Sequence, residues 1–375
     1  MDKIYLDYAA ATPVDRQVFL AMEPYFSDEF FNPSAVYLDA RRTRENLEKA
    51  RSEVAGCLGA RPAEVIFTAG ATEANNMAVQ GVMKRYPEGE VLVCATEHES
   101  VLEPAKQYRH KLIPVGKDGL INLAKLPGLI TNETALVCIG MVNNETGVTQ
   151  PLAKIAQIIS RANQPRGGKP ILFHTDAAQA PNYFDIHIAR LGVDLMSLNG
   201  GKIYGPKQSG VLFAKAGVEL EPLIYGGGQE SGLRSGTENV AGAIGLAAAL
   251  NAAQQNRKAE AKRVKLLREL FIQGITAKIP SARVNGSIKV SSPHIVSLTF
   301  PEVDNERLIM ELDEQGIQAA AGSACSASDG QPSHVLAAMG LPEKDIRSTL
   351  RFSFGRRTAE DDIRRAIAAL SKLLD

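Results

Sequence analysis

The most constraining feature of the chain is a series of short, continuously apolar runs in its central part. These runs occupy residues 91–94, 135–139, 171–173, 193–196 and 210–213. Helical patterns separate them, and residues 152–161 place Ile155, Ile158 and Ile159 on one helical face. Apolar strands that alternate with helices favour a mostly parallel sheet that is covered on both faces. We therefore expect an α/β fold with one large sheet domain.

The pattern changes near residue 257, where a long, charged amphipathic helix is predicted over residues 257–278. A shorter strand pattern at residues 295–300 and two more helical patterns follow. A chain of 375 residues is long enough for two domains. We predict a large domain over residues 13–257 and a smaller α+β domain formed by residues 1–12 and 258–375.

The charge balance argues against several classes of protein. The sequence holds 42 Lys and Arg against 42 Asp and Glu, so nothing suggests a nucleic-acid or membrane-surface protein. No apolar run reaches the roughly 18 residues that span a bilayer, and the N-terminus lacks a signal-peptide pattern. Four cysteines without Cys-x-x-Cys and six histidines without ligand spacing make a disulfide framework or a structural metal unexpected. A cytoplasmic protein is the expectation.

Polar side chains follow four of the predicted strands. His98, Asn143, Asp176 and Lys202 come soon after the runs at 91–94, 135–139, 171–173 and 193–196. Ligands of open α/β sheets collect beyond the carboxyl ends of the strands. Any one of these residues could be a cap or a surface turn, but their arrival at one edge predicts a binding site there.

Two of these residues form a chemically meaningful pair. Lys202 is flanked by Gly200, Gly201 and Gly205, so its amine can approach a flat ring without obstruction. A desolvated lysine loses its proton more easily and becomes a nucleophile. Asp176 could hold the protonated nitrogen of a pyridine ring. A lysine and an aspartate in these roles are what a pyridoxal 5′-phosphate (PLP) site needs.

A phosphate cradle is predicted at residues 69–73, between a strand pattern at 65–67 and a helical pattern at 74–80. There the backbone of Ala71 and the hydroxyl of Thr72 could face an anion at the start of a helix. The sequence contains neither Gly-x-Gly-x-x-Gly nor Gly-x4-Gly-Lys-Ser/Thr, so nucleotide binding is weakly supported.

Short motifs along nearly the whole chain resemble those of the cysteine desulfurases, the NifS/IscS-like branch of the class V aminotransferase superfamily with PLP fold type I. They are YLDYAA (5–10), NPS (32–34), GATE (70–73), TEH (96–98), VNNE (142–145), DAAQ (176–179), KIYGP (202–206), GQE (228–230), RSGTEN (234–239), GSAC (322–325) and LRFS (350–353). Each motif is weak alone, but their order and spacing together are specific. The resemblance implies a large PLP-binding domain and a small domain that carries a catalytic cysteine.

The resemblance also implies a role for each matching residue. Lys202 would bind the cofactor covalently and His98 would stack on its ring and carry protons. The further cofactor contacts would come from Asp176 at the ring nitrogen, Gln179 at the ring oxygen, Ala71 and Thr72 at the phosphate, and Thr237 from a second subunit of a homodimer. Asn143 and Arg351 would hold the substrate carboxylate, and Cys325 would accept the sulfur.

Cys325 lies in a segment of small residues, 319–330, which is typical of a mobile loop. Such a loop would let its thiolate enter the site and leave it again. Cys94 and Cys138 have large apolar neighbours in the sequence, and neither they nor Cys57 are expected to react.

The chain departs from the family pattern at four positions. Asn199 and Gly201 stand where the family has the serine and histidine that touch the phosphate, Ser231 replaces an arginine, and Tyr37 replaces a histidine. Two lost phosphate contacts of about 1–3 kcal/mol each could weaken PLP binding ten-fold or more, unless Asn199 or backbone N–H groups compensate. We interpret these changes as an altered phosphate site.

The implied function is conversion of L-cysteine to L-alanine with formation of an enzyme persulfide. The sulfur would then pass to an acceptor protein, an iron–sulfur scaffold or a sulfur carrier, for iron–sulfur cluster assembly or tRNA thiolation. Another PLP reaction, a selenocysteine lyase or an aminotransferase, is the close alternative. A PLP-poor scaffold that binds sulfur-acceptor proteins is the alternative from another class.

Overall fold

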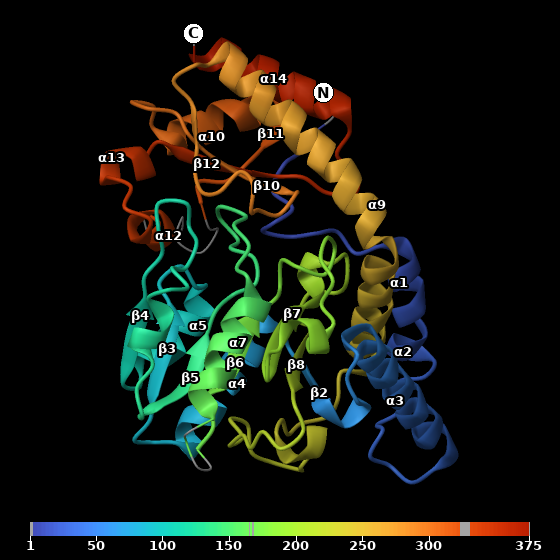
Figure 1. Cartoon of the computed structure of the whole chain (residues 1–375). Helices are drawn as coiled ribbons and strands as arrows, with labels where there is room; N and C mark the ends of the chain where they lie inside the picture. The colour runs from blue at the N-terminus through green and yellow to red at the C-terminus, as the bar shows by residue number, and fades with distance from the viewer. Residues whose placement is uncertain (1–2, 165, 167–168, 323–330, 375) are drawn as a thin grey trace.

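The computed structural model describes residues 3–164, 166, 169–322 and 331–374. Its largest element is a seven-stranded sheet in the order β2-β8-β7-β6-β5-β3-β4 (Figure 1). The strands are β2 (Val65–Thr68), β3 (Glu90–Cys94), β4 (His110–Ile113), β5 (Thr134–Cys138), β6 (Leu172–Asp176), β7 (Leu195–Asn199) and β8 (Gly210–Ala214). β8 runs antiparallel to both β2 and β7, and the other strand pairs described in this sheet are parallel. The predicted mostly parallel α/β fold is confirmed.

Both faces of the sheet are covered because its strands are apolar on both sides. Alternate residues such as Leu92, Val137 and Phe173 pack into one core, with helices α3 (Leu38–Leu58) and α7 (Leu152–Asn163). Their neighbours, such as Val93 and Leu136, pack into another core, with α4 (Ala71–Arg85) and α5 (Glu99–Lys106). Continuous apolar runs are therefore required where a strand is buried from both sides.

One strand begins later than its sequence pattern predicted. β7 starts at Leu195, whereas the apolar run was predicted from residue 193. Asp194 stands just before it and accepts a hydrogen bond from the backbone N–H of Phe173 at 3.1 Å. The carboxylate thus supports the start of β6, and the backbone of Asp194 donates to the carbonyl oxygen of Phe173 and accepts from the N–H of Lys215, each at 2.9 Å.

Helix α9 (Val240–Lys278) is 39 residues long and extends from the region of the large sheet into the region that holds the C-terminus (Figure 1). Its first half is rich in Ala and Gly, and Leu246 and Leu250 pack into the core that α3 and α7 also share. Its second half packs through Val264 and Phe271 into a separate core. The helix crosses residue 257 without interruption, and the short helices α1 (Arg16–Met22) and α2 (Pro24–Ser27) lie against its first half.

The second core joins the two ends of the chain. A three-stranded sheet in the order β12-β10-β9 lies beside a two-stranded pair, β1-β11. Its elements are β1 (Ile4–Tyr5), β9 (Arg283–Val284), β10 (Ile295–Thr299), α10 (Asn305–Glu314), β11 (Ile317–Gln318), β12 (Thr349–Ser353) and α14 (Glu360–Leu374). Leu6 belongs to the same core as Phe352 and Leu370, so the first residues of the chain fold with the last.

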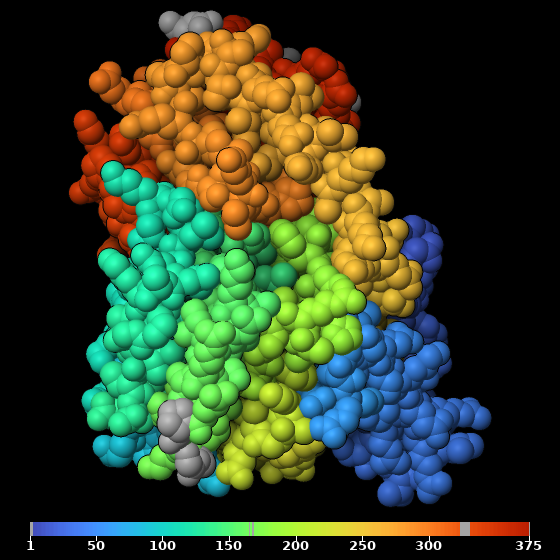
Figure 2. Space-filling view, in the orientation of Figure 1, coloured from blue at the N-terminus to red at the C-terminus, as the bar shows by residue number. Residues whose placement is uncertain are grey.

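Short elements complete the fold. They are α6 (Leu126–Leu129), α8 (Ile188–Leu191), α12 (His334–Ala338), α13 (Glu343–Ile346) and the 3-10 turns η1 (Pro62–Glu64), η2 (Gly200–Lys202) and η3 (Glu230–Gly232). The two regions meet along a continuous seam (Figure 2). An isolated β-bridge pairs Val148 of one region with Ser291 of the other. None of the helices in the described part of the chain has both the length and the apolarity of a bilayer-spanning segment.

Candidate active site

A cavity of about 280 Å³ lies at the carboxyl ends of the central strands, beside the seam between the two regions. It is lined by nine of the residues that the sequence singled out: Ala71, Thr72, His98, Asn143, Asp176, Gln179, Asn199, Lys202 and Arg351. Most come from segments that follow β2, β3, β5, β6 or β7, whereas Arg351 comes from β12. Parallel strands bring their carboxyl ends to one edge, which explains the convergence.

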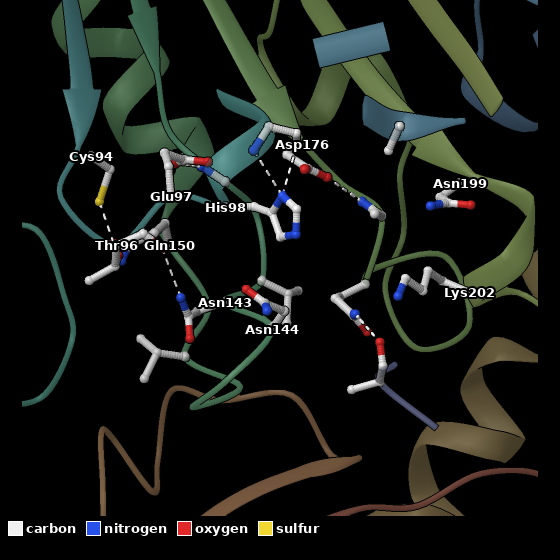
Figure 3. A pocket seen from close by; sticks show the side chains of 18 of the residues that line it. Cys94, Thr96, Glu97, His98, Asn143, Asn144, Gln150, Asp176, Asn199 and Lys202 are labelled. Carbon is white, nitrogen blue, oxygen red and sulfur yellow. Dashed lines mark hydrogen bonds between the residues drawn. The ribbon is translucent and has the colours of Figure 1, made fainter. Parts of the chain in front are cut away.

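Lys202 reaches the cavity from the 3-10 turn η2, directly after β7. Its Nζ donates to the carbonyl oxygen of Ala10 at 2.5 Å, and Figure 3 shows the amine directed toward the space beside His98. The turn requires glycine at position 200, because an added Cβ would lie 2.1 Å from Oγ of Ser209. The tight turn therefore fixes where the lysine leaves the backbone.

Asp176 is held by two hydrogen bonds at the end of β6. Its Oδ1 accepts from the backbone N–H of Ala178 at 2.8 Å, and its Oδ2 accepts from Nδ2 of Asn75 at 2.8 Å. Asn75 is fully buried on α4 and also donates to Oγ of Ser100 at 2.8 Å. The carboxylate therefore has a fixed orientation toward the cavity.

His98 begins α5 as its N-cap, and its ring orientation is set by Ser100. Its Nδ1 accepts from the backbone N–H of Ser100 at 3.1 Å and lies 2.8 Å from Oγ of the same residue. An imidazole nitrogen that accepts carries no proton, so the neutral ring bears its proton on Nε2. Figure 3 places this ring close to Asp176, in the middle of the cavity.

Asn75 and Glu97 were not predicted as site residues. Asn75 is a polar side chain on a helix face that also buries Ala74 and Ala78, which is the one signal that the sequence offered. Glu97 lines the cavity and accepts a short hydrogen bond from the backbone N–H of Gly140. Burial raises the pKa of Glu97 to about 8, and the charge of Asp176 adds to the rise.

Arg351 is almost fully buried and only partly paired. Its Nη2 contacts Oδ1 of Asp7 at 2.6 Å, and its Nη1 donates to the carbonyl oxygen of Asn144 at 3.0 Å. Within the described ranges, its Nε has no hydrogen-bond partner. A buried guanidinium N–H without an acceptor is costly, so this donor indicates a place for an anionic ligand group.

Most of the hydrogen-bonding groups of Asn143 are already paired with nearby backbone groups. Its Oδ1 accepts from the backbone N–H groups of Glu145 at 3.0 Å and Thr146 at 2.8 Å, and its Nδ2 donates to the carbonyl oxygen of Thr96 at 2.9 Å. One hydrogen of Nδ2 remains for a ligand. The side chain is thus held rigidly at the cavity wall.

The opposite wall of the cavity is made by the first turn of α4 and by Asn199. Gly70 precedes this helix with φ of 142°, which leaves the N–H groups of Ala71 and Thr72 outside the helical hydrogen-bond pattern. Oδ1 of Asn199 accepts from the backbone N–H of Gly201 at 3.0 Å. Its Nδ2 therefore faces the cavity (Figure 3), and this arrangement offers several N–H donors to an anion.

One predicted residue that the structure describes, Thr237, is not brought to the cavity. Thr237 is exposed and lines a separate pocket with Arg234 and Asn239. Cys325 lies outside the described residues. Nearby, Ala320 pairs with Arg351, whose backbone N–H donates to the carbonyl oxygen of Ala320 at 2.6 Å. Ala320 stands five positions before Cys325 in the sequence.

The other cysteines lie in different environments. Cys94 lines the cavity and contacts Oγ1 of Thr96 at 3.2 Å, and Cys138 is buried in the sheet. Burial raises the pKa of Cys94 to about 12 and raises that of Cys138 well above its ordinary value. Both thiols therefore stay protonated and unreactive at neutral pH.

Comparisons with known proteins agree with this geometry. The family described as Aminotransferase class-V matches residues 4–366. A protein of Dictyoglomus turgidum named cysteine desulfurase IscS is 35% identical, over 100% of this chain and 95% of its own. A mouse (Mus musculus) protein named cysteine desulfurase is 38% identical, over 96% of this chain and 79% of its own.

Two solved structures are similar as well. One, described as a NifS-like protein, superposes with a TM-score of 0.92 at 30% identity and covers 99% of both chains. Another, described as SspA in complex with cysteine, has a TM-score of 0.82 at 34% identity and covers 94% of this chain and 98% of its own. By its family match and its full-length relatives, the chain belongs to the class-V aminotransferase family, in the group of the cysteine desulfurases.

Proposed function

We propose that the protein is a PLP-dependent cysteine desulfurase that takes sulfur from L-cysteine, releases L-alanine and carries the sulfur as a persulfide on Cys325. The observation that carries the proposal is that Lys202, Asp176 and the partly paired Arg351 line one cavity. An amine, a carboxylate and an anion site in that arrangement suit an amino acid bound beside a pyridine ring. The relative SspA, solved with cysteine, supports this substrate class.

The residues present fit PLP at three points. Asp176, fixed by Asn75 and Ala178, would pair with the ring nitrogen. The N–H groups at the start of α4 and Nδ2 of Asn199 would hold the phosphate. Gln179 would contact the ring oxygen. When bound, PLP supplies an electron sink for the pair that remains after a Cα proton is removed.

The protein's own groups would then do the positioning and the proton transfer. Lys202 would hold the cofactor through its amine, and the same amine, when free, would take the Cα proton of the substrate. His98, with its proton on Nε2, would donate to the substrate from the middle of the cavity. Arg351, through Nε, and Asn143, through Nδ2, would hold the substrate carboxylate.

The acceptor step would belong to Cys325. Its thiolate would attack the substrate sulfur and break the Cβ–S bond, so that the sulfur leaves as the outer atom of a persulfide. Passing that sulfur to an iron–sulfur scaffold or a sulfur-carrier protein would regenerate the thiol. The relatives named cysteine desulfurase support the removal of sulfur from cysteine.

A homodimer is part of the proposal. Thr237 is exposed and lies outside the cavity of its own chain, as expected of a residue that reaches the phosphate of a second subunit. The N-terminal segment also exposes large apolar side chains, among them Phe26, Phe30 and Leu38 at 64–65% exposure. Exposed apolar side chains gathered in one segment are typical of an interface.

A product assay tests the proposal directly. Alanine and sulfide are measured after the protein, PLP, L-cysteine and a thiol reductant are mixed. Wild type is expected to form both products, whereas Lys202→Ala and Cys325→Ala lose both. Cys57→Ala, a half-buried cysteine outside the cavity, is the matched control and should behave as wild type.

Each alternative predicts a different result. Alanine that still forms with Cys325→Ala would refute the assignment of the sulfur acceptor. Turnover of selenocysteine but not of cysteine would favour a lyase for that substrate. A wild-type protein without a visible cofactor absorption band after PLP addition would favour the scaffold alternative.

A further inference from the structure

A buried imidazole outside the predicted site contacts a residue of the cavity wall. His294 precedes β10 and is 3% exposed, and its Nε2 lies 3.2 Å from Oε1 of Gln179. Its ring stacks on Tyr183 with 4.3 Å between the ring centres and 23° between the planes. The contact joins the second core to the large sheet, between residues 115 positions apart in sequence.

The direction of every hydrogen bond in this group follows from one backbone carbonyl. The carbonyl oxygen of Ala9 can only accept, and Nε2 of Gln179 donates to it at 2.9 Å. The amide oxygen of Gln179 must then face His294. Because that oxygen also can only accept, Nε2 of His294 must carry a proton.

The other nitrogen of the ring completes the assignment. Nδ1 of His294 forms a short hydrogen bond with Oγ of Ser292, which is free to donate its hydroxyl proton. The neutral Nε2–H tautomer thus satisfies Gln179 and Ser292, and it leaves the bond from Gln179 to Ala9 in place. Burial lowers the pKa of His294 to about 3, and the nearby charges of Arg351 and Arg268 lower it further, so the ring stays neutral.

We propose that His294 is a positioning residue that locks the amide of Gln179, so that Gln179 presents an N–H and not its carbonyl oxygen to the cavity. Gln179 Nε2 keeps one hydrogen after its bond to Ala9, and Gln179 lines the cavity. An N–H suits an anionic ring oxygen, whereas a flipped amide would set two oxygens against each other. This inference rests on the proposed PLP function, and it identifies His294 as the group that orients Gln179, one of the proposed PLP contacts.

The reversed amide is unfavourable on two sides while His294 is present. It would direct Oε1 of Gln179 at the carbonyl of Ala9 and Nε2 of Gln179 at the N–H of His294. Without the imidazole donor, only the Ala9 contact would still oppose the flip. We therefore expect the loss of His294 to loosen Gln179 without removing any group that touches the cavity directly.

Three variants separate positioning from simple stability. His294→Phe keeps a ring against Tyr183 but removes the donor, and His294→Gln returns an amide N–H near the position of Nε2. Tyr183→Phe is the matched control, because it alters the same stack and removes only the bond from the tyrosine hydroxyl to the carbonyl oxygen of Phe354 at 3.2 Å. Each protein is titrated with PLP, and its dissociation constant and visible absorption maximum are measured.

His294→Phe is expected to bind PLP about ten-fold more weakly, equivalent to ~1.4 kcal/mol, and to shift the absorption maximum. His294→Gln should restore most of the PLP affinity and most of the absorption maximum. Tyr183→Phe should lower the melting temperature and leave the PLP affinity and the absorption maximum unchanged. Wild-type affinity and absorption in His294→Phe would overturn the inference. An equal loss of PLP affinity in His294→Phe, His294→Gln and Tyr183→Phe would also overturn it, because it would indicate a structural role.

A measurement without cofactor keeps the inference testable if His294→Phe does not fold. Nitrogen NMR shifts of histidine-labelled wild-type protein distinguish the two neutral tautomers, and the Nε2–H form is expected for His294. The Nδ1–H form would overturn the inference. A wild type that binds no PLP would instead refute the proposed function, and the tautomer measurement would still decide the orientation of Gln179.

Discussion

Two ends of the cavity are built in different ways. At the carboxylate end, formed by Asp176, Asn75, Ser100 and His98, each side chain that faces the cavity is held by another buried side chain or backbone group. At the helix end, formed by Ala71, Thr72, Asn199 and Gly201, the donors are backbone N–H groups, the hydroxyl of Thr72 and a single amide. The fixed end suits a group whose position must not vary, whereas the simpler end tolerates a change of residue.

The contrast accounts for two of the four departures from the family pattern, Asn199 and Gly201. An added Cβ at Gly201 would meet nothing closer than 3.4 Å, so a side chain could be lost or regained there without repacking. Asn75, in contrast, is fully buried and holds Asp176 and Ser100 together. Substitution is tolerated where few partners depend on the residue.

The largest effect is expected from Asp176→Asn at the carboxylate end. The amide N–H₂ would face Nδ2 of Asn75, donor against donor, and the charge at the ring nitrogen would be lost. We expect alanine formation from L-cysteine to fall by about 10²–10³-fold. Asp194→Asn, outside the cavity on the neighbouring segment, is the control that should stay near wild type. A fall of less than about ten-fold in Asp176→Asn would refute the assignment of this end.

Asn75→Ala tests whether activity depends on the hydrogen bond that orients Asp176, and not on Asp176 alone. Oδ2 of Asp176 would lose its partner, so we expect about ten-fold lower kcat and a free energy of unfolding lower by about 1–3 kcal/mol. The next residue offers a control, because Asn76 donates to the carbonyl of Thr72 from the exposed side of α4. Equal losses of kcat in Asn75→Ala and Asn76→Ala would show that the network has no special role.

The helix end is expected to respond in affinity more than in rate. Asn199→Ala removes the one side-chain amide there and should weaken PLP binding by about ten-fold with little change in kcat at saturation. The double variant Asn199→Ser with Gly201→His restores the family pattern and should bind PLP more tightly than wild type. Equilibrium titration measures both. No gain in the double variant would mean that the existing donors already compensate fully.

The last prediction concerns Glu97, another residue that lines the cavity, and is measured in stability and not in activity. Its pKa rises from 4.5 in the unfolded chain to about 8 in the fold, so the folded state binds the extra proton between these values. Its contribution to stability is therefore full below about pH 4.5 and is lost as the pH rises toward 8. Urea unfolding across this range should show a flatter decline for Glu97→Gln than for wild type. Parallel curves would contradict the raised pKa.

The sequence carried enough information to predict the sheet and much of the cavity. Continuous apolar runs marked the buried strands, and the polar residues after them reached one edge because parallel strands end together. Thr237 and the residues of the second core did not follow from that rule. The start of β7 at Leu195 differs by two residues from the predicted start, although the backbone of Asp194 already hydrogen-bonds to Phe173 and Lys215.

The residues that were missed owe their roles to distant partners. Asn75, Glu97 and His294 each act on a segment that sequence spacing does not connect to them: Asp176, Gly140 and Gln179, respectively. Burial also changes their chemistry, since it raises the pKa of Glu97 and lowers that of His294. Such roles depend on tertiary packing, which local patterns do not encode.

Helix α9 belongs to two cores at once, with Leu246 in one and Phe271 in the other. Melting one half would leave the other half with a frayed end and an uncovered apolar stripe. Heating should therefore give a single calorimetric transition, and not two separate ones, despite the two cores. The long helix thus couples the two cores thermodynamically, so that both regions unfold together.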